Sequence, residues 1–556
     1  MSEKILVAVA WPYADGLLSI GNVAGSDLPA DIFARYHRTK GNEVLMVSGS
    51  DEHGTPITLK AEEEGITPYE VAAKYHSAYL QAKQKLGISY DLYTRTGTDN
   101  HAAVTKDIFL TLLKKGYIYK GTMTQPFCPN CERFMPDRYI EGTCPFCGFT
   151  SARGDQCDQC GKPLNASELI NPRCKVCGTP PEFRETEHFF LKLTAFQEKL
   201  QEWLKTKTFW RQNVLNFSLG YLAEGLKDRA ITRDIDWGIT VPVPGFENKR
   251  IYVWFEAVIG YLSATKEWAA NGNDPEKWRE FWEGDAKTCY FIGKDNIVFH
   301  SIIWPAMLMG YGGLNLPYDV PSNEFLSIEG KKISKSRNWA VWVPDYLSRY
   351  DPDPLRYFLS INMPETSDTD FSWAEFFRRN NDELVATYGN LVNRVLTFVY
   401  RNFDGAVPSA GELDAQSQAL LRQSEEALGK VDRLLYGCHF REAIRTAMSL
   451  AQEANRYLDD KSPWKAIKQD RNAAAASLWV AIAVISDLRT MLYPFLPFSS
   501  EKLHKLLGFE GKIEQSGWRT NRPRAGQRLV TPQPLFTKLD EKLVEEETAR
   551  LGRPTP

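Results

Sequence analysis

The sequence predicts an α/β protein: a doubly wound, Rossmann-like parallel sheet, split by a cysteine-rich insertion and followed by an all-α C-terminal bundle. Three observations support this fold class. Apolar strand-like runs alternate with amphipathic helical stretches, eight of the ten cysteines gather between Cys128 and Cys177, and the chain is largely helical after residue 370. Alternating strands and helices are typical of a parallel sheet covered by helices on both faces.

The first elements have the layout of a phosphate-binding βα unit. We predict a strand at residues 5–10, a turn at 11–16, the stretch Ser19-Ile20-Gly21-Asn22, and a helix through residue 36. A strand that leads through a Gly-containing turn into a helix is where α/β folds bind phosphates. The stretch contains neither GxGxxG nor a P-loop motif, so the residues alone leave the nucleotide chemistry open.

Later elements continue the pattern on both sides of the insertion. We predict strands at 43–48, 250–254 and 288–293, and helices at 69–84 and 297–309. One sheet interrupted by an inserted domain is the simplest explanation. The predicted domains are residues 1–117 and 230–325 for the two halves of the sheet, 118–229 for the insertion, 326–375 for a lysine-rich loop and linker, 376–545 for the helical domain, and 546–556 for a tail.

Bulk composition is that of a soluble protein. Hydrophobic residues make up 43% and charged residues 25% of the chain, and no apolar run approaches the roughly 18 to 20 residues that span a bilayer. The first strand begins too early to leave room for a signal peptide, so we expect a cytoplasmic protein without a membrane partner. The net charge of −3 argues against a globally basic nucleic-acid coat but leaves local basic patches open.

The insertion carries four CxxC pairs. The segments between successive pairs are 12, 9 and 13 residues long. In three of the four pairs a glycine follows the second cysteine. In a cytosolic chain, four such pairs favour metal over disulfides or a redox dithiol. Eight thiolates fit two closed, structural zinc sites of four cysteines each. The pairs are Cys128/Cys131, Cys144/Cys147, Cys157/Cys160 and Cys174/Cys177.

Residues 331–337 form a second charged element. Three lysines, an arginine and two serines in seven residues could clamp a pyrophosphate leaving group, although such a cluster taken alone is more often a solvated basic loop. Lys332-Ile333-Ser334-Lys335-Ser336 resembles the KMSKS signature of class I aminoacyl-tRNA synthetases, and Ser19-Ile20-Gly21-Asn22 stands where that class carries HIGH. The resemblance is narrowed to methionyl-tRNA synthetases by the double zinc knuckle and by residues 10–14, 49–57, 252–261 and 293–301. It covers the chain up to about Lys542.

This resemblance implies an activity and its site residues. The activity is ATP-dependent formation of methionyl-adenylate and transfer of methionine to methionine tRNA. The implied catalytic residues are Lys332, Lys335, Ser336, Ser19 and Asn22. ATP binding is assigned to Ser19, Gly21, Asn22, Gly293, Asp295, Lys332 and Lys335. Methionine binding is assigned to Tyr13, Asp51, Trp254, Ala257, Tyr261, His300 and Trp304. Asn390, Arg394 and Trp464 would read the anticodon.

Metals and partners follow from the same resemblance. We expect one or two structural Zn²⁺ ions, and Mg²⁺ that accompanies ATP. One zinc site is assigned to Cys144, Cys147, Cys157 and Cys160, and the other to Cys128, Cys131, Cys174 and Cys177. Because the chain ends without the extra tRNA-binding module that some relatives use to dimerise, we expect a monomer.

The sequence departs from the family pattern in the ATP element. Ser19 and Asn22 replace the two histidines of HIGH, and no histidine lies within residues 1–36. Asp15, Leu17 and Asp27 also differ from the usual residues, and Asp15 places a negative charge near the triphosphate. Tryptophanyl enzymes of the same class often carry Thr-Ile-Gly-Asn here, so a hydroxyl and a carboxamide can serve.

Two further hypotheses remain open. The chain could be a paralogue that binds methionine or tRNA with weakened activation, or a synthetase-like ligase with a small-molecule acceptor. The presumed anticodon readers argue against the second.

Overall fold

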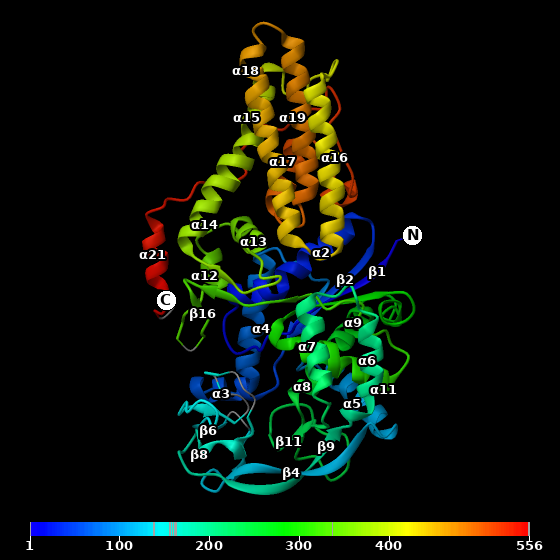
Figure 1. Ribbon diagram of the computed structural model, residues 1–556, viewed down its shortest axis with the longest axis vertical. Helices are drawn as coiled ribbons and strands as arrows, with labels where there is room; N and C mark the ends of the chain where they lie inside the picture. The colour runs from blue at the N-terminus through cyan, green and yellow to red at the C-terminus, as the bar shows by residue number, and fades with distance from the viewer. Residues whose placement is uncertain are drawn as a thin grey trace.

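The fold is built on a five-stranded parallel sheet in the lower body of the molecule (Figure 1). The computed structural model describes residues 2–136, 139–154, 157, 159–160, 164–335 and 337–553. The strand order is β14-β13-β1-β2-β3. The bounds are Lys4–Val9 for β1, Glu43–Ser50 for β2, Leu92–Arg95 for β3, Lys287–Gly293 for β13 and Ser322–Asn323 for β14. In this order the central strand β1 places the first loop at the middle of the sheet's carboxyl edge.

Helices cover both faces of the sheet, as the alternation of side chains along β1 requires. Ile5, Val7 and Val9 belong to one apolar core, whereas Leu6 and Ala8 belong to another. The first core includes α2 (Leu28–Thr39) and the second includes α5 (Asp99–Lys114), α9 (Gly260–Asn271) and α11 (Trp304–Tyr311). Further helices of this body are α3 (Thr55–Glu64), α4 (Pro68–Lys85), α6 (Gln197–Lys205), α7 (Gln212–Ala223) and α10 (Arg279–Trp282). The predicted doubly wound α/β class is therefore confirmed.

The predicted strand at 250–254 is wrong. Only Arg250–Ile251 is extended, as β12, and it pairs antiparallel with β11 (Thr232–Arg233) outside the parallel sheet. From Val253 the chain is helical, as α8 (Val253–Glu256). A short run of apolar residues is compatible with either a buried strand or a buried helix, and here the helix lets Trp254 line a cavity beside Tyr13.

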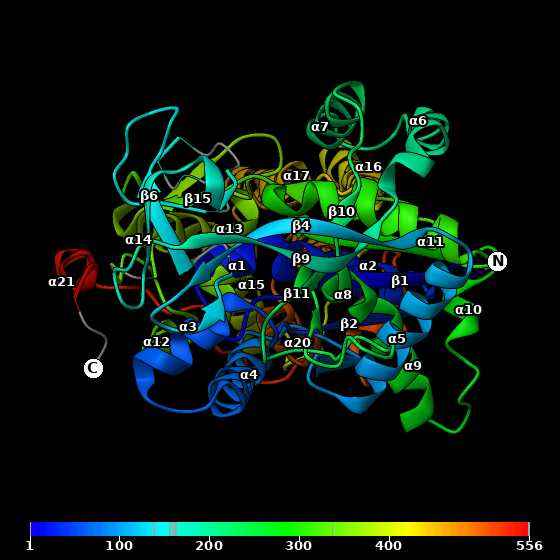
Figure 2. The same cartoon turned by 90° about the horizontal axis from the view of Figure 1, so that it is seen from below.

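The insertion is a long ribbon with a small sheet at one end. Strands β4 (Ile118–Cys128) and β9 (Glu182–Leu191) pair antiparallel along their length, and Figure 2 shows them crossing beneath the body. The small sheet has the order β7-β6-β8, with β6 at Ile140–Thr143, β7 at Ala152–Arg153 and β8 at Ile170–Cys174. β10 (Arg229–Ala230) and β5 (Arg133–Phe134) flank the ribbon.

A helical bundle rises above this body (Figure 1). Its helices are α15 (Asn390–Asn402), α16 (Ala415–Tyr436), α17 (Phe440–Lys461), α18 (Pro463–Ala466), α19 (Arg471–Leu492) and α20 (Pro497–Leu506). Among the described residues, α19 is the one helix long and apolar enough to cross a membrane, although the sequence predicted no apolar stretch of that length. Because 94% of its most apolar stretch is buried, it has the environment of a core helix in a soluble protein.

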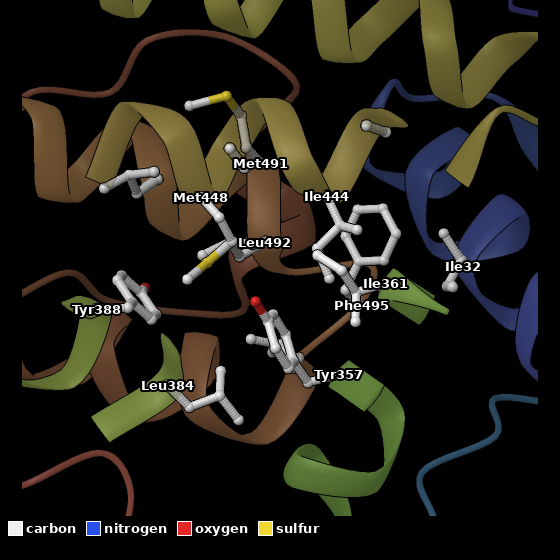
Figure 3. Close-up of a cluster of buried hydrophobic side chains, with 14 of the residues drawn as sticks. Ile32, Tyr357, Ile361, Leu384, Tyr388, Ile444, Met448, Met491, Leu492 and Phe495 are labelled. Atoms are coloured by element: carbon white, nitrogen blue, oxygen red, sulfur yellow. The ribbon is translucent and has the colours of Figure 1, made fainter. Parts of the chain in front are cut away.

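A continuous apolar core joins the bundle to the body. Figure 3 shows Ile32 of α2, Ile361 of α13 (Pro352–Ile361), Ile444 of α17 and Phe495 gathered in one cluster. Tyr388 of the π-helix η8 (Asn380–Gly389) closes it on one side. The helix that follows the first loop therefore packs against the base of the bundle.

The chain end returns to the body. Helix α21 (Leu543–Arg550) lies beside α14 (Trp373–Arg379) and α12 (Val343–Leu347) (Figure 1). Its buried Glu547 accepts hydrogen bonds from Arg349, at 2.9 and 2.8 Å, and from Tyr350 at 2.8 Å. The domain boundaries given above remain a prediction.

Candidate active site

A cavity of about 670 Å³ opens at the carboxyl edge of the sheet, where β1 and β13 end. The first loop and the lysine-rich loop both line it. All seven residues predicted to bind ATP line this cavity: Ser19, Gly21, Asn22, Gly293, Asp295, Lys332 and Lys335. Segments far apart in sequence thus form one site large enough for a nucleotide.

Ser19 and Asn22 are bonded to each other. Ser19 is the N-cap of the short helix α1 (Ile20–Asn22), and its Oγ accepts a hydrogen bond from the backbone N–H of Asn22 at 3.4 Å. In return, the Ser19 hydroxyl and backbone N–H both donate to Asn22 Oδ1, at 2.9 and 3.2 Å. This capping box fixes the loop where the helix begins. A hydroxyl and a carboxamide therefore face the cavity in a defined arrangement.

The lysine-rich loop closes directly onto the first loop. The loop, residues 331–337, begins in the second strand of a hairpin formed by β15 (Leu326–Ile328) and β16 (Lys331–Lys332). Strand β17 (Thr369–Phe371) pairs with β15 on its other side. A Cβ on Gly21 would lie 2.5 Å from Ile333 Cδ1, so glycine is what allows this approach. Lys335 Nζ lies 2.5 Å from Asp15 Oδ1. Ser336 lies outside the described residues.

Asp27 also forms an ion pair, with the buried Lys83. Asp27 lines the large cavity, and its Oδ1 accepts hydrogen bonds from Lys83 at 2.6 Å and from Tyr90 at 2.5 Å. Lys83 and Asp27 are each 1% exposed. Burial lowers the pKa of Lys83, and Asp27 offsets part of that effect. Both acids that depart from the family pattern, Asp15 and Asp27, are thus neutralised by lysines of this chain.

Asp51 stands at the end of β2 with its carboxylate buried. Its Oδ1 accepts one weak hydrogen bond, from the backbone N–H of His53 at 3.3 Å. Burial and the nearby Glu256 carboxylate raise the pKa of Asp51 well above its usual range. A buried acid with a raised pKa and few donors favours an incoming cation such as an α-ammonium group.

The other residues predicted to bind methionine lie close by at different depths. Tyr13 and Trp254 line a narrow cavity of about 30 Å³ next to the large cavity, and Trp254 Nε1 donates to Tyr13 Oη at 3.2 Å. Tyr261 donates to His300 Nε2 at 2.7 Å, and neither residue lines the two cavities. Burial lowers the pKa of His300 to about 4, so its ring is neutral at pH 7.

Trp304 and Ala257 stand apart from the cavities. Trp304 is fully buried and donates to Tyr290 at 3.0 Å, which makes it part of the wall behind the His300 ring. Ala257 follows α8 directly and begins the next helical turn. Neither residue lines the two cavities described above.

Sequence reasoning missed a buried acid–histidine group next to Asp51. Glu256 Oε1 lies 2.8 Å from His53 Nδ1, and Glu256 Oε2 lies 3.2 Å from His101 Nε2. Burial alone would raise the pKa of Glu256, but the two imidazoles hold it below its usual range. Arg233, whose guanidinium lies 3.9 Å from the Tyr252 ring centroid, also lines the narrow cavity. His53 and Glu256 lie in the stretches 49–57 and 252–261 that carry the family resemblance, but only the fold shows that their side chains meet.

The eight insertion cysteines form two groups with the predicted membership. In each group all four sulfurs lie within 4.8 Å of one another. The measured Sγ–Sγ distances run from 3.4 to 4.0 Å. Four sulfurs about 2.3 Å from a tetrahedral Zn²⁺ would stand about 3.8 Å apart, so the thiol sets fit the metal. Gly148 and Gly178 have φ of 74° and 76°, which lets the chain turn around the sulfurs; Gly161 lies outside the described residues.

The predicted anticodon residues come together at the far end of the bundle. Asn390 and Arg394 are one helical turn apart on α15. The Arg394 guanidinium lies 4.4 Å from the Trp464 ring centroid. Arg394 is also 3.4 Å from Asn455 Oδ1 and 3.6 Å from Asp459 Oδ1. The result is a half-exposed aromatic and guanidinium surface, suited to stacking on an unpaired base.

Two family descriptions match almost the whole chain. "tRNA synthetases class I (M)" matches residues 5–396, which hold the parallel sheet, the insertion and both signature loops. "Anticodon binding domain of methionyl tRNA ligase" matches residues 407–554. The chain belongs to the methionyl-tRNA synthetase family. The resemblance drawn from the sequence is thereby confirmed.

Relatives within the family are similar over their full length. The chain is 66% identical to the methionine–tRNA ligase of Dehalococcoides mccartyi, over 99% of this chain and 100% of the relative. It is 52% identical to that of Thermomicrobium roseum, over 99% of each. The solved structure of Mycobacterium tuberculosis methionyl-tRNA synthetase with methionyl-adenylate matches at a TM-score of 0.81 and 25% identity, over 96% of this chain and 100% of that one.

Proposed function

We propose that this methionyl-tRNA synthetase activates methionine with ATP and transfers it to methionine tRNA. The single observation that carries the proposal is the ATP cavity, where the two signature loops meet beside the buried Asp51. The methionine carboxylate attacks the α-phosphorus of ATP, which releases pyrophosphate. A tRNA hydroxyl then attacks the carbonyl carbon of the adenylate, which forms the ester and releases AMP. The chain's own residues align the reactants and neutralise charge that develops on the phosphate oxygens.

Each group has a role suited to its surroundings. Asp51 pairs with the α-ammonium of methionine, while Tyr13, Trp254 and the neutral His300–Tyr261 pair surround the side chain. Ala257 and Trp304 line neither cavity and support these residues, Trp304 through its hydrogen bond to Tyr290. From the first loop the Asn22 amide NH2 group donates to the phosphates, and Ser19, whose hydroxyl proton is donated to Asn22 Oδ1, holds that carboxamide in place. Lys332 and Lys335, with Ser336, neutralise the leaving pyrophosphate, and Gly293 and Asp295 border the nucleoside. Mg²⁺ accompanies ATP and supplies charge neutralisation at the phosphates.

Zinc and tRNA occupy separate parts of the molecule. Each cysteine group would hold one structural Zn²⁺. The group of Cys128, Cys131, Cys174 and Cys177 would tie the end of β4 to β8 of the small sheet, and the group of Cys144, Cys147, Cys157 and Cys160 would brace the small sheet itself. Asn390, Arg394 and Trp464 stack on and bond to anticodon bases. We propose that the chain acts as a cytoplasmic monomer.

The test is aminoacylation of methionine tRNA with labelled methionine. Lys335→Gln should lower the rate by about 10²- to 10³-fold, as for loss of one preorganised donor to the transition state. Lys331→Gln is the matched control: Lys331 lies in the same loop, over the Trp339 ring at 4.3 Å, and does not line the cavity. It should stay within about threefold of wild type. Equal effects of the two changes would contradict the assignment.

Two outcomes would favour the other hypotheses. Methionine and tRNA binding without any charging would indicate a paralogue with weakened activation. Adenylate formation without tRNA binding would indicate a ligase with a small-molecule acceptor.

A further inference from the structure

Asp15 and Lys335 link the two loops of the ATP site across 320 residues of sequence. Their charged atoms lie 2.5 Å apart, with side chains 22% and 40% exposed. The stem of Lys335 runs along the first turn, because a Cβ on Gly16 would lie 3.5 Å from Lys335 Cδ. Together with Ile333 against Gly21, this gives the lysine-rich loop two points of attachment to the first loop.

The ion pair leaves the lysine able to bind phosphate. An ammonium group has three N–H donors and no acceptor, and Asp15 takes one of them. Lys335 also lines the ATP cavity, so its remaining donors are available on that side. A lysine stem is flexible when it is free, and a fixed carboxylate restricts where its charge can lie.

We propose that Asp15 is a positioning residue that docks the lysine-rich loop onto the first loop and so places Lys335 for the phosphates. The inference rests on the proposed function, because it assumes that Lys335 contacts ATP. It explains how the chain tolerates an acid near the triphosphate: the acid orients a cation in a site whose first loop has no histidine. Asp15 acts through Lys335 and need not touch the nucleotide.

Loop docking can be measured without catalysis. Residues 331–337 contain four trypsin sites, and cleavage after Lys332 and Arg337, followed by mass spectrometry, reports how often the loop is undocked. Because a partly exposed ion pair is weak, Asp15→Asn should raise this cleavage rate by about two- to fivefold. The matched control is Asp368→Asn, which removes a carboxylate from the same cavity; Asp368 pairs with Lys294 at 2.7 Å, so cleavage of the loop should not change.

A charge swap tests whether the ion pair itself, rather than either residue alone, docks the loop. Asp15→Lys should expose the loop by like-charge repulsion, and adding Lys335→Asp should restore protection. Aminoacylation should stay low in the swapped protein, because position 335 no longer carries a lysine to bind the phosphates. Protection that is not restored, or equal cleavage in Asp15→Asn and Asp368→Asn, would overturn the proposal.

Kinetics then distinguish positioning from competition. If Asp15 positions Lys335, Asp15→Asn lowers kcat for ATP–pyrophosphate exchange by about two- to fivefold and leaves the KM for methionine unchanged. A faster enzyme with a lower KM for ATP would show that Asp15 competes with the phosphates, and would overturn it. A wild-type protein without any exchange would contradict the proposed function instead, while the cleavage results would still decide whether Asp15 docks the loop.

Discussion

Replacing Arg356 should loosen the joint between the anticodon bundle and the catalytic body. Arg356 is fully buried on α13. Its Nη2 lies 2.6 Å from Asp31 Oδ2 on α2 and 2.9 Å from the Pro494 carbonyl oxygen, and its Nε donates to the Phe495 carbonyl oxygen at 2.8 Å. One guanidinium thus holds the helix after the first loop and the chain at the base of the bundle.

The magnitude follows from what Arg356→Met would leave behind. Breaking a buried ion pair by removing one partner costs about 3 to 5 kcal/mol. Asp31 would keep Arg35 at 3.0 Å and two hydrogen bonds from Ser89, so the lower end applies. Two carbonyl oxygens at the base of the bundle would lose their donor. We expect a loss of about 3 kcal/mol, which is roughly a 100-fold fall in protection from hydrogen exchange.

Hydrogen exchange followed by mass spectrometry is the suitable assay, because it reports each region of a multidomain chain separately. The fall should appear in peptides that cover α2, α13 and residues 493–497, and peptides of the β4–β9 ribbon should not change. Asp31→Asn should have a similar effect, and the double variant should lose less than the sum of the two, since the residues share one interaction. A loss below about 1 kcal/mol, or additive effects, would refute this reasoning.

Three further predictions concern pH, metal and tRNA. Burial would raise the pKa of Asp31, but the neighbouring Arg35 and Arg356 hold it at about 2, below its value in an unfolded chain. Its contribution of about 2 kcal/mol to stability is therefore complete above pH 5 and lost as the pH falls through 2. Hydrogen-exchange protection of α2 and α13 that does not fall between pH 4 and 2 would contradict this. Metal analysis should find two Zn²⁺ per chain and one after Cys144→Ser, because each thiol group binds independently; loss of both would show that the sites are coupled. Trp464→Ala should weaken methionine-tRNA binding by about 1 to 3 kcal/mol without changing methionine activation, and an unchanged Kd would remove Trp464 from the anticodon surface.

Much of the fold could be predicted because its signals are local. The apolar runs of β1 and β2, the helix at 69–84 (observed as Pro68–Lys85) and the four CxxC pairs each lie within a short stretch of sequence. The run at 250–254 failed because a few apolar residues have no distinguishable period, and only packing decided that Val253 begins a helix.

The partners inside the site could not be predicted for a different reason. The sequence shows Asp15 and Asp27 as isolated acids, and their lysines lie 320 and 56 residues away along the chain. The same holds for Glu256 between its two histidines. Such groups exist only once the segments that carry them are assembled, so their effect on charge near the cavity depends on the fold.

The most direct test of the account is methionine-dependent ATP–pyrophosphate exchange, measured without tRNA on zinc-replete protein with Mg²⁺. The account predicts exchange in the wild-type protein, and its loss by about 10²- to 10³-fold in Lys335→Gln. Exchange would mean that Ser19 and Asn22, with Lys335 held by Asp15, support adenylate chemistry without a histidine in the first loop. No exchange, in a protein that still binds methionine, would contradict that claim.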